Sequence, residues 1–74
     1  MTLEEALEIV VKEFKIKPVD TKKQSDCIEG TTEGAYFMIA ENDTFFYFTI
    51  PEKKMYYSID KQNRKITAKK PFIH

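Results

Sequence analysis

Residues 35–50 read AYFMIAENDTFFYFTI, two strongly β-forming runs separated by the pair Asn-Asp at 42–43. Both residues of that pair tolerate positive φ angles, so they are expected to form a two-residue hairpin turn. Because side chains alternate along a strand, the hairpin sorts both runs onto two faces. The predicted pairs are Ala40 with Phe45, Ile39 with Phe46, Met38 with Tyr47 and Phe37 with Phe48.

Two later turns extend the hairpin into a meander. A connection at 51–54, which begins with a proline preset for a turn, pairs Ile50 with Met55. A second turn at 61–64 pairs Ile59 with Ile66 and Tyr57 with Ala68. One predicted face is mainly apolar: Ala35, Phe37, Ile39, Phe46, Phe48, Ile50, Met55, Tyr57, Ile59, Ile66 and Ala68. The other is mixed: Tyr36, Met38, Ala40, Phe45, Tyr47, Thr49, Tyr56, Ser58, Asp60, Lys65, Thr67 and Lys69.

The first sixteen residues have the apolar periodicity of an amphipathic helix. Thr2 and Glu5 match a capping box at its start, and Pro18 is expected to end it. The apolar positions that share one stripe are Leu3, Ala6, Leu7, Val10, Val11 and Phe14. This stripe requires a partner, and the apolar face of the meander supplies one.

The sequence therefore predicts a single α+β domain over residues 1–74. One N-terminal helix packs on one face of an antiparallel meander of four strands, or of five if residues 26–29 form a short first strand. The segment 19–33 is left open between that strand and a loop that places only Ile28 in the core.

Composition excludes several classes of protein. Twelve basic and twelve acidic residues give a formal charge of zero, which does not favour a globally basic nucleic-acid binder. No apolar run has the length of about 20 residues needed to cross a bilayer. The N-terminus lacks the pattern of a signal peptide, so a cytoplasmic protein is expected, with a fragment processed from a secreted precursor as the alternative.

Charge is unevenly distributed along the chain. Residues 1–48 hold five lysines against ten acidic residues, whereas residues 49–74 hold seven basic residues against two acidic ones. Mutual neutralisation of the two parts across a compact fold is the first interpretation, and a basic edge that meets an acidic partner is the second.

Residue types that carry catalysis are sparse. The only histidine is His74, at the end of the chain, and Cys27 has no CxxC companion. One Cys, one His and scattered carboxylates do not make a metal site, and two glycines do not make a phosphate-binding loop. We therefore expect no enzyme, no cofactor and no metal.

The mixed face of the predicted sheet carries the most informative pattern. Its large apolar and aromatic residues are Tyr36, Met38, Phe45, Tyr47 and Tyr56, with Met38 and Tyr47 at the centre as cross-strand neighbours. Tyrosines tolerate a solvated sheet face, so ordinary exposure is one interpretation. A protein partner or a second copy of the chain is the other, because Tyr and Met are enriched in interfaces. With Lys65 and Lys69 at the rim, the same patch resembles a stacking platform for single-stranded nucleic acid, but Asp60 and the neutral charge disfavour that partner.

The last predicted hairpin, MYYSIDKQNRKI at 55–66, resembles the terminal hairpin of PepSY domains, and the opening LEEALEI at 3–9 resembles their first helix. The family usually has glycine where this chain has Arg64, which makes Asn63 the expected left-handed residue of the turn. The resemblance implies a non-catalytic module that binds or inhibits another protein, often a peptidase. Together with the patch, it predicts a protein-binding or inhibitory module that uses the sheet face or a strand edge. Single-stranded nucleic-acid binding and a homodimer are the alternatives.

Overall fold

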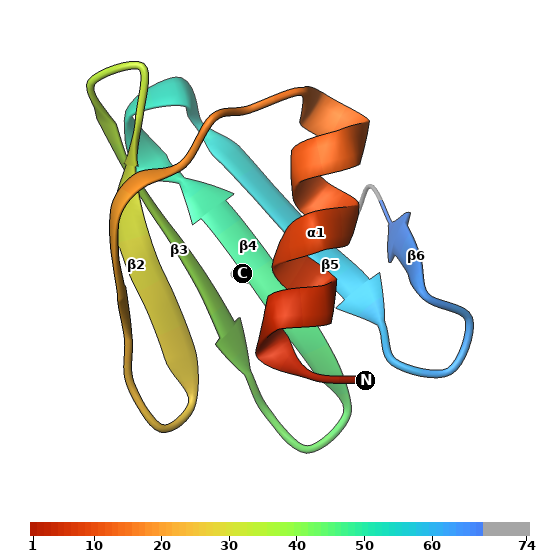
Figure 1. Ribbon diagram of the computed structural model, residues 1–74. Coiled ribbons are helices and arrows are strands. Elements are labelled where there is room, and N and C mark those ends of the chain that lie inside the picture. The colour runs from red at the N-terminus through yellow and green to blue at the C-terminus, as the bar shows by residue number, and fades with distance from the viewer. Residues whose placement is uncertain (68–74) are drawn as a thin grey trace.

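The computed structural model describes residues 1–67, which form one helix and a six-stranded antiparallel sheet (Figure 1). The predicted α+β class and the antiparallel meander are confirmed, with the strands in sheet order β1-β2-β3-β4-β5-β6. Ala68 and Lys69, which were predicted to continue the last strand, lie outside the described residues. The elements are α1 (Leu3–Phe14), β1 (Val19–Lys23), β2 (Cys27–Thr32), β3 (Ala35–Glu41), β4 (Phe45–Ile50), the 3-10 turn η1 (Pro51–Lys53), β5 (Met55–Asp60) and β6 (Lys65–Thr67).

Helix α1 begins with the predicted capping box. The Thr2 hydroxyl accepts from the Glu5 backbone N–H at 3.2 Å, and the Glu5 carboxylate accepts from the Thr2 N–H at 2.8 Å. The helix ends earlier than predicted, because Lys15 adopts a left-handed conformation at φ 55° and terminates it before Pro18 is reached. Pro18 therefore lies in the connection to β1 and is not the stop signal.

The sheet has six strands, so the prediction of four or five was too low. The predicted strand at 26–29 exists as β2 and runs on to Thr32, whereas β1 was missed. Strand β1 reads VDTKK, is exposed at all five positions and is interrupted by an irregularity between Val19 and Lys22. An exposed, polar edge strand shows no apolar alternation, and sequence periodicity therefore gives no sign of it.

The predicted register between β3 and β4 is wrong by two residues. Ala40 pairs with Tyr47, and Met38 pairs with Thr49. The reason is the turn chemistry of Asn42, whose side-chain Oδ1 accepts from the backbone N–H groups of Thr44 and Phe45, both at 2.9 Å. This Asx arrangement moves the turn one residue along the chain. A slip of two residues leaves every side chain on its predicted face, because strands alternate with a period of two.

The registers between β4, β5 and β6 agree with the prediction. Ile50 pairs with Met55, and Ile59 pairs with Ile66. The left-handed residue of the last turn is Arg64, at φ 55°, and the expectation that Asn63 takes this conformation is wrong. The Asp60 side chain accepts from the backbone N–H groups of Gln62 and Asn63, which leaves the bend to the following residue.

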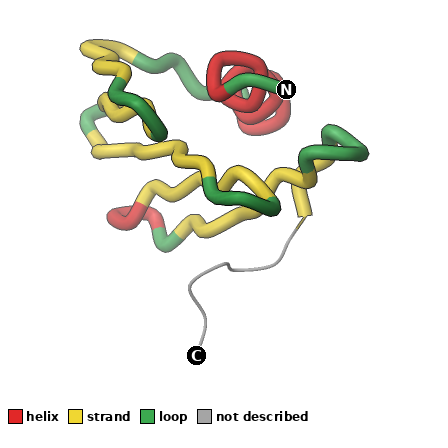
Figure 2. The backbone as a smooth tube through the Cα atoms, turned by 90° about the horizontal axis from the view of Figure 1, so that it is seen from below, coloured by secondary structure: helices red, strands yellow, loops and turns green. Residues whose placement is uncertain are grey.

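The core lies between α1 and one face of the sheet, here called the inner face (Figure 2). Phe37, Phe46 and Phe48 are fully buried there, and the ring of Phe14 from the helix lies 5.9 Å from that of Phe48. The buried core residues are Leu3, Ala6, Val10, Ile28, Ala35, Phe37, Ile39, Phe46, Phe48, Ile50 and Ile59. Met55, Tyr57 and Ile66 pack against this core, so the described residues of the predicted apolar face lie where they were expected.

Candidate binding surface

The opposite face of the sheet, here called the outer face, points away from α1 (Figure 2). The five residues predicted for a partner surface share it through the alternation of β3, β4 and β5. Tyr36 is 43% exposed, and the other four are half-buried. These five side chains, Tyr36, Met38, Phe45, Tyr47 and Tyr56, are called the outer patch below.

The centre of the outer patch differs from the prediction. Met38 and Tyr47 are not cross-strand partners, because the corrected register places Thr49 opposite Met38 and Ala40 opposite Tyr47. Ala40 and Thr49 are each only 5% exposed, and the Oγ1 atom of Thr49 has no hydrogen-bond partner among residues 1–67. The large side chains of the outer patch therefore lie around Ala40 and Thr49, and Met38 does not pair directly with Tyr47 across β3 and β4.

Tyr36 is held in a polar network at the β1–β2 side of the outer face. Its hydroxyl donates to a Glu29 carboxylate oxygen at 2.7 Å, and Gln24 Nε2 donates to the other oxygen at 2.9 Å. Cys27 Sγ lies 3.6 Å from Gln24 Oε1, and burial raises the pKa of its thiol. A hollow of about 320 Å³ adjoins this network; its lining residues are Asp20, Lys22, Gln24, Glu29, Gly30, Thr31 and Tyr36.

We expect the Tyr36 hydroxyl to ionise well above the usual pH for a tyrosine. The hydrogen bond to Glu29, and then burial, raises the pKa of Tyr36 to about 12 from 10. A group whose pKa is raised by folding stabilises the native state fully below the unfolded value, and this contribution is lost between pH 10 and 12. An absorbance titration at 295 nm should show a late step near pH 12 that is missing in Tyr36→Phe. An unchanged titration curve in this variant would refute the assignment.

The opposite corner of the outer face contains Phe45. Its ring lies 6.2 Å from that of Tyr47 in an edge-on arrangement. A hollow of about 260 Å³ adjoins it, lined by Thr44, Phe45, Ser58, Asp60 and Thr67. The backbone N–H groups of Gln62 and Asn63 lower the pKa of Asp60, which keeps this carboxylate charged.

The Asp60 carboxylate reduces the positive charge of the basic rim that was predicted here, Lys65 and Lys69. Lys65 is exposed and pairs with Asp60 in the register of β5 and β6, so an acidic residue adjoins it on the neighbouring strand. Lys69 lies outside the described residues. The described part of this rim is therefore mixed in charge.

Ion pairs join the acidic and basic parts of the chain. Lys53 contacts Glu33 at 3.0 Å, and Lys61 contacts Glu41 at 2.9 Å. Lys61 also lies over the ring of Phe46, with its ammonium 5.2 Å from the centroid. These contacts favour the interpretation that the uneven charge is neutralised within the fold.

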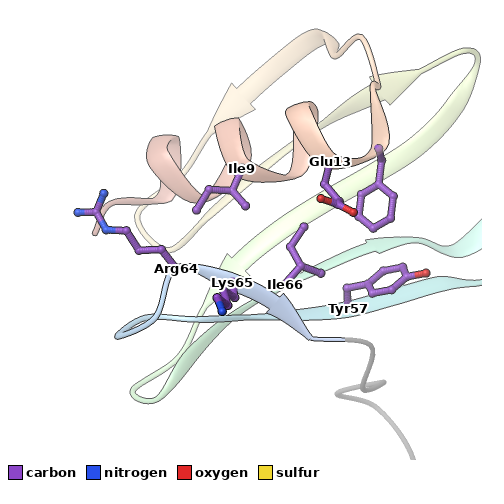
Figure 3. Close-up of a pocket in the computed structure, with 7 residues that line it drawn as sticks. Ile9, Glu13, Tyr57, Arg64, Lys65 and Ile66 are labelled. Carbon is purple, nitrogen blue, oxygen red and sulfur yellow. The ribbon is translucent and has the colours of Figure 1, made fainter.

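A third hollow lies on the inner face and was missed by the sequence reasoning. It measures about 480 Å³ and separates α1 from the hairpin of β5 and β6 (Figure 3). Its lining residues are Ile9, Glu13, Phe14, Tyr57, Arg64, Lys65 and Ile66. One helix, about 10 Å wide, is too narrow to cover six strands spaced by about 4.8 Å, and this comparison of widths predicts an uncovered flank.

Among residues 1–67, no group of three or more acidic, cysteine or histidine side chains is placed to hold a metal ion. In that same part of the chain, no helix combines the length and the apolar character that a bilayer crossing requires. Comparison of the sequence and the structure with protein-family models, curated proteins and solved structures finds no significant match.

Proposed function

We propose that this protein is a non-catalytic module that binds another protein through the outer patch. The observation that carries the proposal is the gathering of five large apolar and aromatic side chains on the sheet face that α1 does not cover. Tyrosine and methionine are both enriched at protein interfaces. Tyrosine offers a large contact area with little loss of conformational freedom, and the flexible methionine adapts its shape to a partner. The partner we propose presents an apolar protrusion that fits over Ala40 and Thr49, with the larger side chains around it.

The electrostatics of the outer face support a protein partner over a nucleic acid. Tyr36 is the most exposed aromatic residue in the part of the chain that the structure describes, and its hydroxyl donates a hydrogen bond to the carboxylate of Glu29. Asp60 lies beside Phe45. A base stacked on either ring would bring its phosphate close to a negative charge. Because phosphate contacts supply most of the affinity for single strands, this arrangement is unfavourable for them.

Met38→Lys tests the proposal. Lysine is chosen because Glu29 lies opposite residue 38, so that the new charge has a favourable neighbour and the fold is preserved. We expect the immobilised variant to retain at least tenfold less of the partner that the wild-type protein captures from a lysate of its source organism. This expectation follows from the cost of removing the lysine ammonium from water when an apolar partner covers it.

The matched control is Glu8→Gln, which changes the net charge by the same amount on the exposed side of α1. It should capture the partner as the wild type does. Equal capture by Met38→Lys, with an unchanged unfolding curve, would refute the outer patch as the contact surface. Sedimentation equilibrium tests the homodimer alternative. If the wild-type protein is a dimer at micromolar concentration and Met38→Lys is a monomer, the outer patch binds a second copy of the chain and not a different protein.

A further inference from the structure

We propose that the hollow between α1 and the β5–β6 hairpin is a second binding site, which takes a short extended peptide segment with an apolar centre and an acidic residue at one end. The site lies on the inner face, the side of the sheet on which Figure 2 shows α1, and the outer patch lies on the opposite face. The proposal stands on the apolar floor of the hollow and on the placement of charge along it.

The apolar floor of the hollow is a partly exposed extension of the hydrophobic core. Ile9 and Phe14 come from α1, and Tyr57 and Ile66 come from β5 and β6; all four are half-buried (Figure 3). The Phe14 and Tyr57 rings lie 4.8 Å apart and close one end. At about 480 Å³, the hollow is large enough for two apolar side chains, and filling it would complete the burial of four residues that the single helix leaves partly open.

Charge is arranged with a direction along the hollow. Arg64 flanks the end next to the start of α1, where it lowers the pKa of Glu5 as a minor contribution beside the Thr2 backbone N–H. Glu13 flanks the other end (Figure 3). Within residues 1–67, neither Arg64 nor Glu13 forms an ion pair. A ligand that places a carboxylate near Arg64 and a cation near Glu13 would complement both.

The span between the two charges sets the length of the ligand. Because Arg64 lies near Glu5, the helical segment from residue 5 to residue 13 approximates this span and covers about 12 Å at 1.5 Å per residue. An extended chain covers this distance with about four residues at 3.3 Å each. The expected ligand is therefore a segment of about four residues, with an acidic end, two apolar residues and a basic end.

The test uses the blocked peptide Glu-Leu-Phe-Lys, titrated to millimolar concentration into the ¹⁵N-labelled protein of residues 1–74 at low salt. Amide shifts should change at Ile9, Glu13, Tyr57 and Ile66, and Met38→Lys should bind the peptide as the wild type does. The peptide Gln-Leu-Phe-Lys should bind about threefold more weakly than Glu-Leu-Phe-Lys, because it lacks the carboxylate for Arg64.

Arg64→Glu should reverse this preference between the two peptides. Lys12→Glu is the matched control: it reverses a charge on α1 away from the hollow and should keep the preference. Each protein variant is titrated with both peptides, and the result is the ratio of the two affinities. A change in folding stability lowers both affinities equally and leaves this ratio unchanged. No shift changes at millimolar peptide, changes confined to the outer patch, or a preference that survives Arg64→Glu would each overturn the proposal. Shift changes at Ile9 and Ile66 that depend on protein concentration alone would assign the hollow to a second copy.

Discussion

Phe48→Ala is expected to lower the free energy of unfolding by about 3–5 kcal/mol, the usual cost of removing a fully buried phenylalanine. Phe48 is completely buried at the centre of the inner face. Its ring lies 5.9 Å from that of Phe14 on the helix and 6.4 Å from that of Phe37 on the neighbouring strand. Its removal leaves a cavity where α1 joins the sheet, and urea denaturation measures the loss.

The matched control lies three residues earlier on the same strand. Phe45 is half-buried on the outer face, and Phe45→Ala should cost less than half as much. If Phe48→Ala fails to fold, Phe48→Leu provides a milder version of the same comparison. Equal losses at the two positions would contradict the assignment of the two faces.

Gly30→Ala is expected to cost about 1–3 kcal/mol, the range found for overpacked sites. A Cβ atom at residue 30 would lie 2.9 Å from Cε2 of Phe37 and 2.9 Å from the backbone oxygen of Val19. The first contact pushes on a buried ring, and the second pushes on β1, which lies at the edge of the described sheet next to β2. Thermal or urea unfolding measures the cost, and amide exchange should show the loss concentrated in β1.

Gly34 provides the control for this steric effect, because its backbone conformation, and not a crowded neighbour, is what favours glycine there. Gly34 has φ +82° and open space around its Cα, so Gly34→Asn should be nearly neutral because asparagine tolerates the left-handed region. Replacement of Phe37 by leucine should reduce the additional cost of Gly30→Ala by removing the ring atoms that the new Cβ meets. Additive losses in the double variant would show that the ring is not the obstacle.

The hydrophobic alternation of residues 35–59 was sufficient to assign the two faces of the sheet. Even the incorrect register between β3 and β4 preserved the faces, because the error was two residues. The position of the turn was not predictable from residue preferences alone. It depends on Asn42, whose side-chain oxygen accepts hydrogen bonds from the backbone N–H groups of Thr44 and Phe45. Asn42 therefore precedes the turn and is not one of its two central residues.

The N-terminal half of the sheet was less accessible to sequence reasoning. Strand β1 is polar and exposed throughout, so its pairing with β2 is carried by backbone hydrogen bonds that leave no periodic pattern. The hollow beside Tyr57 and Ile66 was also missed, although one helix about 10 Å wide cannot cover even four strands spaced by about 4.8 Å. Likewise, the left-handed conformation of Arg64 follows from the way Asp60 holds the preceding amides.

The outer patch was anticipated in its membership but not in its arrangement. The period of two places Tyr36, Met38 and Tyr47 on one face in any register that keeps the alternation. Which of them meet across the strands depends on the register itself, and the structure places Ala40 and Thr49 among them. The anchoring of Tyr36 by Glu29 required β2, whose extent the sequence left open.

Site-specific photo-cross-linking tests the proposed function most directly. A benzoylphenylalanine placed at position 36, where the tyrosine is 43% exposed on the outer face, is compared with the same group at position 8 on the exposed side of α1. Irradiation in the source lysate should give one discrete adduct with a different protein from position 36 and none from position 8. An adduct from position 8 alone, or one with twice the mass of this chain from position 36, would contradict a foreign protein bound at the outer patch.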